Sequence, residues 1–454
     1  MTISTDIQKH LLSRLLALIS ECPSMGISSL EEAENCTEEL AKMVSKVALQ
    51  YFVDQISAKK CHQGTALECP CGKKARFVNY RQRHIVTLHG EITVKRAYYH
   101  CQACGSGQIP WDKANGLNQR VYTPQLKAHV AFTMSQMPYQ AGCNLMKRLT
   151  GFDIKVSSAE EIVLEMGQRL RSEENAEIQN AEEASVCALA ELLGEEVPPL
   201  VAPPVPSHAV HAKQGDRLYV SLDGVMAHID KEWHEIKSTA VYTAKKDEKG
   251  RDTLLKSAYA GAREPASQFG KRFSRLACAW SVGSYAEVVA LADGAHSNWK
   301  LIEEVFPKAI QILDFYHASE HLSEVADAVH GVGSASSKAL WKTLSDLLKD
   351  RGSKPVQAAL KSIETDDVKA RDVIRRECNY FKTNENRTQY PDYLSKGLMI
   401  GSGVIEATCK VLVSQRLKQS GMRWVQAGAD AIIALRARIL NGDEAALQRC
   451  ARAT

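Results

Sequence analysis

The chain has 454 residues, of which 44% are hydrophobic and 24% are charged, and its formal net charge is +4. This length predicts about two to four globular domains, and the composition excludes a collagen, a disordered tail and a membrane channel. No apolar run approaches the roughly 18–20 residues that span a membrane. The first 20 residues lack a signal-peptide pattern, so we expect a cytoplasmic protein.

The sequence divides into seven predicted segments. They are a helical N-terminal region (1–60), a zinc ribbon (61–120), a helix-turn-helix-like DNA-binding domain (121–172), an acidic and Pro-rich linker (173–213), the first part of an α/β core (214–320), a helical insertion (321–396) and the second part of the core (397–454). The linker is predicted from eight Glu without Lys or Arg between residues 173 and 196, followed by a Pro-rich run.

Four cysteines in the second segment form two pairs on either side of a predicted hairpin, whose strands lie at 83–88 and 92–99. The candidate ligands are Cys69, Cys71, Cys101 and Cys104. Two pairs of thiolates are a common ligand set for structural Zn²⁺, and thirteen cysteines without a secretion signal favour reduced thiols. Cys61 or His62 is an alternative ligand in place of one of the first pair, and unligated cysteines are the less favoured alternative to a metal site.

Basic residues around these cysteines and in the next segment are candidates for DNA binding. They are Lys73, Lys74, Arg76, Arg81, Arg83 and Lys155. Cations beside tyrosines suit contact with a phosphate backbone, although such a cluster can also be a solvated face. Three helices predicted at about 125–134, 139–149 and from 157 onward are consistent with a helix-turn-helix, but many three-helix units bind no DNA.

The core begins with three strand-like runs at 217–222, 238–244 and 254–260. Helices and short apolar strands then alternate, with strands at 288–292 and 309–313. This order predicts a mixed sheet whose first strands are antiparallel and whose last strands are parallel.

Asp223 and Asp293 each follow a predicted strand and precede Gly, which places them at the carboxyl ends where α/β sheets bind ligands. Converging carboxylates suit Mg²⁺ or Mn²⁺. Asp-Gly is also an ordinary turn signal. Glu406, near the start of the last long helical pattern, is a third candidate, and the alternative is a helix-terminal Glu paired with Lys410.

The order Asp223, Asp293, helical insertion, Glu406 resembles the DDE transposases, which have an RNase H-like core. The segment Asp314-Phe315-Tyr316-His317 is similar to the C/D(2)H signature of Mutator-like transposases. The bacterial insertion-sequence transposases of the ISKra type give the nearest resemblance. It extends in patches from about residue 60 to 440, through Cys69-Pro70-Cys71-Gly72, Leu291-Ala292-Asp293-Gly294-Ala295, Gly401-Ser402-Gly403-Val404-Ile405-Glu406 and Gly421-Met422-Arg423-Trp424.

The resemblance implies that Asp223, Asp293 and Glu406 hold two Mg²⁺ ions for phosphodiester hydrolysis at the element ends and strand transfer of the 3′-hydroxyl to target DNA. Asp314 is the competing second aspartate. His317 is either a DNA-positioning residue or a satisfied core histidine. The expected partners are the terminal inverted repeats and target DNA, bound by a homodimer or higher oligomer without a membrane. Further DNA-binding candidates follow Glu406, namely Lys410, Arg416, Lys418 and Arg423.

Two other functions fit the same residues. One is a DNA-binding regulator derived from a transposase without catalysis. The other is a metal-dependent nuclease or resolvase with an RNase H-like fold. DNA binding without cleavage favours the regulator, and joining of a 3′-hydroxyl end to a new DNA molecule separates a transposase from the nuclease.

Overall fold

The structure is a computed structural model that describes residues 12–13, 16–17, 28–117, 121–192, 217–280, 282 and 285–452. Most of the chain before residue 28 and the Pro-rich part of the predicted linker lie outside these residues. The chain forms two compact units, Met1–Met166 with Glu444–Thr454, and Gly167–Asp443. The predicted mixed α/β class is confirmed. Across the described residues, we find no helix with the length and apolar character needed to cross a bilayer.

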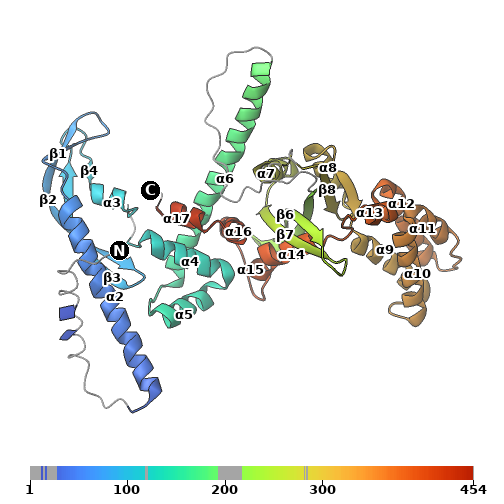
Figure 1. The fold of residues 1–454 in the computed structure, drawn as a ribbon, viewed down its shortest axis with the longest axis horizontal. Coiled ribbons are helices and arrows are strands. Elements are labelled where there is room, and N and C mark those ends of the chain that lie inside the picture. The colour runs from blue at the N-terminus through green and yellow to red at the C-terminus, as the bar shows by residue number, and fades with distance from the viewer. Residues whose placement is uncertain are drawn as a thin grey trace. The chain divides into compact units, whose positions relative to one another are not determined.

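The first unit contains a small sheet and several helices (Figure 1). Its strands, in the spatial order β1-β2-β3-β4, are all antiparallel to their neighbours. The elements are α2 (Leu30–Lys60), β1 (Ala66–Glu68), β2 (Lys74–Thr87), β3 (Gly90–His100), β4 (Gly107–Gln108), α3 (Pro110–Ala114), α4 (Pro124–Gln136), α5 (Tyr139–Thr150), the start of α6 (Val156–Leu192) and α17 (Glu444–Arg452).

Helix α2 covers the free edge of β3 with side-chain hydrogen bonds. The Gln50 side chain donates to the Thr93 carbonyl at 2.8 Å and accepts from the Thr93 N–H at 2.9 Å. The Ser57 hydroxyl donates to the Lys95 carbonyl at 2.7 Å. An uncovered strand edge exposes unpaired backbone groups. The side chains of α2 pair with such groups on β3, so this edge of the sheet is covered by the helix.

Helices α4 and α5 occur where the sequence predicts them, but α6 does not end near residue 172. It begins at Val156 and continues to Leu192, so the acidic residues 173–192 are helical and do not form a linker. The last helix also differs from expectation, because α17 belongs to the first unit and not to the core. Its Cys450 thiol donates to the Met166 carbonyl at 3.3 Å.

The second unit is built on a five-stranded sheet in the order β7-β6-β5-β8-β9. Strands β5 (Arg217–Ile229), β6 (Glu232–Lys246) and β7 (Asp252–Ala262) are antiparallel, and β8 (Glu287–Ala292) and β9 (Ile310–Leu313) join parallel to β5. The short apolar sequences of β8 and β9 are typical of parallel strands that are buried on both faces.

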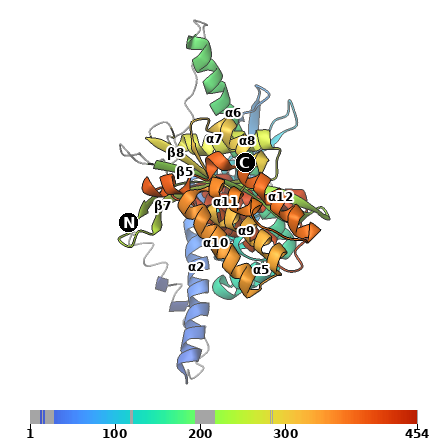
Figure 2. The ribbon, with the colours of Figure 1, turned by 90° about the vertical axis from the view of Figure 1, so that its right-hand side faces the viewer.

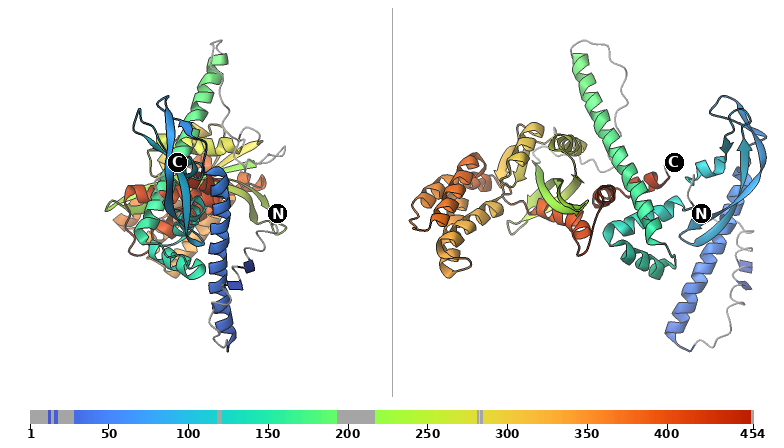
Figure 3. Two further views of the ribbon diagram at one scale, coloured as in Figure 1. Left: turned by 90° about the vertical axis from the view of Figure 1, so that its left-hand side faces the viewer. Right: turned by 180° about the vertical axis from the view of Figure 1, so that it is seen from behind.

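Helices cover both faces of this sheet (Figure 3). α7 (Ala266–Ala279) and α8 (His296–Val305) pack on one face. α14 (Gly403–Thr408), the π-helix η3 (Cys409–Ser414) and α16 (Gln426–Leu440) pack on the other, and the short α15 (Gln415–Leu417) follows η3.

The predicted insertion is helical and continues the core beyond β9. Its helices are α9 (Phe315–His330), α10 (Ala335–Arg351), α11 (Ser353–Lys361), α12 (Val368–Thr383), the 3₁₀ turn η2 (Glu385–Arg387) and α13 (Tyr390–Ser395). Figure 2 shows α9 to α12 packed together as a bundle. Their apolar side chains belong to the same buried cluster as the sheet.

A buried ionic network joins the start of the acidic part of α6 to the second unit. Arg272 of α7 is 1% exposed, and its guanidinium lies 2.6 Å from Glu174 and 2.8 Å from Glu264. Arg171 contacts Glu174 at 3.1 Å. Although burial opposes ionisation, the positive charges of Arg171, Arg272 and Arg438 lower the pKa of Glu174 to about 2.

We expect Glu174→Gln to lower the free energy of unfolding by about 3 kcal/mol at pH 7, because it leaves buried arginines short of a partner. A lowered native pKa stabilises the fold above the unfolded value near 4.5, and this contribution is lost as the pH falls toward 2. The free energy of unfolding, measured with urea, should therefore fall more between pH 5 and pH 3 for the wild type than for Glu174→Gln. The control is the exposed Glu248→Gln, and equal pH dependence of the wild type and Glu174→Gln would contradict this account.

Candidate functional site

Two aspartates stand side by side where parallel pairing ends. β5 and β8 pair in register up to Leu222–Ala292, so Asp223 and Asp293 are the next residue on each chain segment. Asp223 differs from expectation in one respect, because β5 does not end before it. The strand continues to Ile229 in the hairpin with β6, so of the two strands only β8 ends at the site.

Both carboxylates are held by hydrogen bonds. Asp223 accepts from the Gly224 N–H at 2.6 Å, and the Cys409 thiol lies 3.5 Å from its other oxygen. Asp293 accepts from the Ala295 N–H at 3.1 Å and the Asn298 side-chain amide at 2.9 Å. These donors fix the two groups, and on Asp293 they contact the same oxygen, Oδ1.

Burial and the negative charge of Asp293 raise the pKa of Asp223 above the ordinary aspartate value, against the effect of the Gly224 N–H donor. Two half-buried carboxylates that repel one another in this way form a place where a hard divalent cation would relieve the repulsion.

Glu406 is exposed on α14, which packs against β5 and β6. Cys409 follows it by one helical turn and begins the π-helix. Burial and the negative charges of Asp223 and Glu406 raise the pKa of the Cys409 thiol. The sequence interpretation missed Cys409 as a contact of Asp223, although its spacing of three residues from Glu406 placed both on one helix face.

The structure does not bring all three carboxylates within ligand distance of one another. Within the described part of the chain, the cysteine cluster is the only group of three or more His, Cys, Asp or Glu whose ligand atoms all lie within 4.8 Å. Asp223 and Asp293 are therefore the organised part of the acidic site, and Glu406 is exposed on the helix that packs against β5 and β6.

Asp314 has a different environment from the other two aspartates. It is 1% exposed, and its two oxygens accept from the backbone N–H groups of His317 and Ser402. It thereby caps α9 and anchors the loop that leads into α14, which is also held by a 2.8 Å bond from the Phe315 N–H to the Ile400 carbonyl. Because it is buried and a backbone N–H donates to each of its oxygens, this carboxylate has a structural position.

His317 is half-buried near the start of α9. Its Nδ1 lies 3.4 Å from a Glu320 oxygen, and its ring centroid lies 5.5 Å from that of His321.

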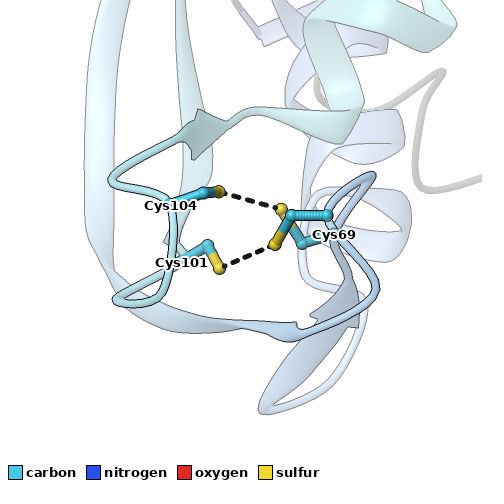
Figure 4. A group of neighbouring side chains, drawn as sticks. Cys69, Cys101 and Cys104 are labelled. Carbon is cyan, nitrogen blue, oxygen red and sulfur yellow. Dashed lines mark hydrogen bonds between the residues drawn. The ribbon is translucent and has the colours of Figure 1, made fainter.

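The four predicted cysteines come together between the β1–β2 and β3–β4 connections (Figure 4). Sγ of Cys69 lies 3.5 Å from Sγ of Cys104, and Sγ of Cys71 lies 3.7 Å from Sγ of Cys101. Thiolates at about 2.3 Å from a tetrahedral Zn²⁺ stand roughly 3.8 Å apart. The cluster can therefore hold a structural metal ion such as zinc.

The pKa values of the thiols differ within the cluster because the cysteines lie close together. Hydrogen bonds from the Ser106 hydroxyl and backbone lower the pKa of Cys104 to about 6. Although the Lys73 N–H favours its thiolate, the neighbouring Cys104 and Cys69 raise the pKa of Cys71 to about 12. A cation at the centre would remove this mutual repulsion and bind all four thiolates.

The alternative ligands Cys61 and His62 lie outside the cluster. The Cys61 thiol accepts from the Ala97 N–H at 2.9 Å and lies 3.2 Å from the Lys95 carbonyl, so it joins α2 to β3. The His62 ring packs edge-on against Phe77, with centroids 4.8 Å apart. Both residues have structural positions.

Most of the predicted DNA-binding cations are exposed, but Arg83 and Arg416 make contacts within the protein. The exposed ones are Lys73, Lys74, Arg76, Arg81, Lys155, Lys410, Lys418 and Arg423. Arg83 pairs with Asp112 at 2.7 Å, in the same site as the buried Arg96. Arg416 is fully buried over the Trp424 ring at 4.7 Å, so the expectation that it contacts phosphate is corrected to a packing role.

Comparison of the chain with protein-family models gives no match, and comparison with curated protein sequences gives none either.

We expect Cys101→Ser to release bound zinc and lower the unfolding temperature, because a buried ligand of the four-thiolate set is removed. Zinc content by elemental analysis should fall well below the one ion per chain of the wild type. Cys36→Ser, which changes an exposed cysteine of α2, is the control and should keep the ion. Unchanged zinc and stability in Cys101→Ser would refute the metal site.

Proposed function

We propose that the protein is a DDE transposase of an insertion sequence, with a catalytic centre built from Asp223, Asp293 and Glu406. The observation that carries the proposal is the position of Asp223 and Asp293, side by side at the end of the β5–β8 pairing. The helix of Glu406 packs against β5 and β6 next to them.

The fold of the second unit is compatible with this proposal. An antiparallel hairpin sheet followed by two parallel strands is the mixed sheet that we expected for an RNase H-like core. The bundle of α9 to α13 stands in sequence between the second aspartate and Glu406, as the helical insertion of the resemblance does.

Asp293 is the better second aspartate because its environment leaves one carboxylate oxygen for a ligand. Its two hydrogen bonds reach Oδ1 alone, whereas both oxygens of Asp314 accept backbone N–H groups. In this scheme Asp314 positions the loop before α14 and thus the helix of Glu406.

The residues of the chain have distinct tasks in this mechanism. Gly224 and Cys409 orient Asp223 through one contact to each of its oxygens. Asn298 orients Asp293 through Oδ1, which leaves Oδ2 for a ligand. Bound Mg²⁺ would supply activation of the attacking oxygen and charge stabilisation of the leaving 3′-oxygen. Glu406 would reach the same centre from its exposed position on α14.

We further propose that the first unit binds the element ends. The exposed cations Lys73, Lys74 and Arg76 lie on or beside β2, next to the cysteine cluster. The Arg81 guanidinium lies 3.4 Å from the centre of the Tyr98 ring, which keeps its side chain extended on the sheet. The helices α4, α5 and α6 supply a candidate helix-turn-helix with the exposed Lys155 just before α6.

The catalytic proposal is tested by Mg²⁺-dependent cleavage of DNA that carries the flanking element ends. We expect nicking and 3′-end joining by the wild type, and loss of both in Asp223→Asn and Asp293→Asn. Asp314→Asn should instead lower stability by about 2 kcal/mol, because a buried hydrogen-bond acceptor is removed, and should still cleave while folded. Cleavage without joining favours a nuclease, binding without cleavage favours a regulator, and full activity in Asp223→Asn would show that the centre lies elsewhere.

We expect the triple substitution Lys73→Ala, Lys74→Ala, Arg76→Ala to weaken DNA binding and flatten its salt dependence. The slope of log K against log salt should become shallower by roughly 0.9 for each phosphate that the variant no longer neutralises. The matched control removes three exposed lysines of the insertion, Lys349, Lys354 and Lys361. Identical slopes for the wild type and the first variant would show that the cluster is only a solvated face.

A further inference from the structure

Tyr380 brings the helical insertion to the acidic site. It lies on α12, and its ring packs on Gly294, the residue after Asp293. A Cβ added at Gly294 would overlap the ring and stand 2.6 Å from the hydroxyl oxygen. The glycine therefore leaves room for this tyrosine at the turn that carries Asp293.

The Tyr380 hydroxyl is buried and has no hydrogen-bond partner among the residues that the structure describes. Two tyrosines of the neighbouring α13 behave differently. The Tyr390 hydroxyl donates to the Leu313 carbonyl at 3.0 Å, and the Tyr393 hydroxyl donates to the Asn386 carbonyl at 3.0 Å. Because a buried hydroxyl without a partner destabilises the fold, the hydroxyl of Tyr380 points to a ligand that the protein itself does not supply.

The ring is held rigidly in this position. It stacks on the His321 ring with centroids 3.9 Å apart and an interplanar angle of 22°. His321 in turn is fixed by a 2.6 Å contact between its Nδ1 and the buried carboxylate of Glu377. Arg376 pairs with the same carboxylate. The direction of the hydroxyl is therefore set by packing and by a carboxylate–histidine pair.

The hydroxyl lies beside the turn that carries Asp293, since a Cβ built on Gly294 would stand 2.6 Å from it. Burial and then the negative charge of Asp293, followed by those of Glu377 and Asp314, raise the pKa of Tyr380. The hydroxyl nevertheless makes no hydrogen bond to Asp293, whose Oδ1 is taken by Ala295 and Asn298.

We propose that the Tyr380 hydroxyl donates a hydrogen bond to a water ligand of a divalent cation held by Asp293. The inference rests on the proposed function, because it takes Asp293 to be a metal ligand. Tyr380 is then a positioning residue, and the insertion forms part of the wall of the acidic centre.

The test is the affinity for Mn²⁺ of the zinc-loaded full chain without DNA, measured from the electron paramagnetic resonance signal of free Mn²⁺. Tyr380→Phe removes only the hydroxyl and should weaken Mn²⁺ binding about two- to tenfold, the worth of one neutral hydrogen bond. Tyr393→Phe is the matched control and should bind as the wild type does. Asp293→Asn should lose most of the binding.

The unfolding temperature without Mn²⁺ provides the second measurement. Tyr380→Phe should unfold at the wild-type temperature or above it, because the deleted hydroxyl has no protein partner, whereas Tyr393→Phe should unfold lower. A lower unfolding temperature for Tyr380→Phe would overturn the inference by revealing such a partner. The inference would also be overturned if Tyr380→Phe bound Mn²⁺ with wild-type affinity while Asp293→Asn had lost binding. Undiminished binding in Asp293→Asn would instead overturn the proposed metal centre itself.

Discussion

The in-register parallel pairing of β5 with β8 is the constraint on which the acidic centre depends. It ends at Leu222 and Ala292, and it therefore sets two carboxylates next to one another without any contact between their own side chains. Two carboxylates that repel one another cannot supply the free energy that holds them close together. The apolar strands supply the free energy that holds Asp223 and Asp293 together, because β8 and the paired part of β5 are largely buried.

A second set of contacts returns the chain to this site after the insertion. The loop before α14 is tied to the end of β9 by the bonds from Ser402 to Asp314 and from Phe315 to Ile400. Glu406 lies one helical turn beyond that loop. The insertion is thus connected to the centre at its two ends and also at its middle, where α12 places Tyr380 on Gly294. The bundle and the sheet share one buried core, so movement of either would alter the acidic site.

Features that depend on a few adjacent residues could be predicted from the sequence, whereas contacts between residues distant in sequence could not. The two cysteine pairs and the Asp-Gly sequences after apolar strands were visible because each depends on a few adjacent residues. The extension of β5 past Asp223 was not, since its turn uses Asp230 and Lys231 at positive φ without the Gly that usually marks a hairpin.

Other features depended on partners that are distant in sequence. The acidic part of α6 resembled a linker partly because Arg272, which neutralises Glu174 at its start, comes from another helix. Arg416 resembled a phosphate ligand because nothing adjacent in sequence shows that it lies buried over Trp424. Tyr380 carried no signal, since only the fold places an α12 side chain against the turn after β8.

The most direct test of the metal centre is anomalous X-ray diffraction from crystals of the protein soaked in Mn²⁺. We expect a manganese peak bounded by oxygens of Asp223 and Asp293, with Asp314 still hydrogen-bonded to the backbone of Ser402. A peak on Asp314, or none at the end of the β5–β8 pairing, would contradict it.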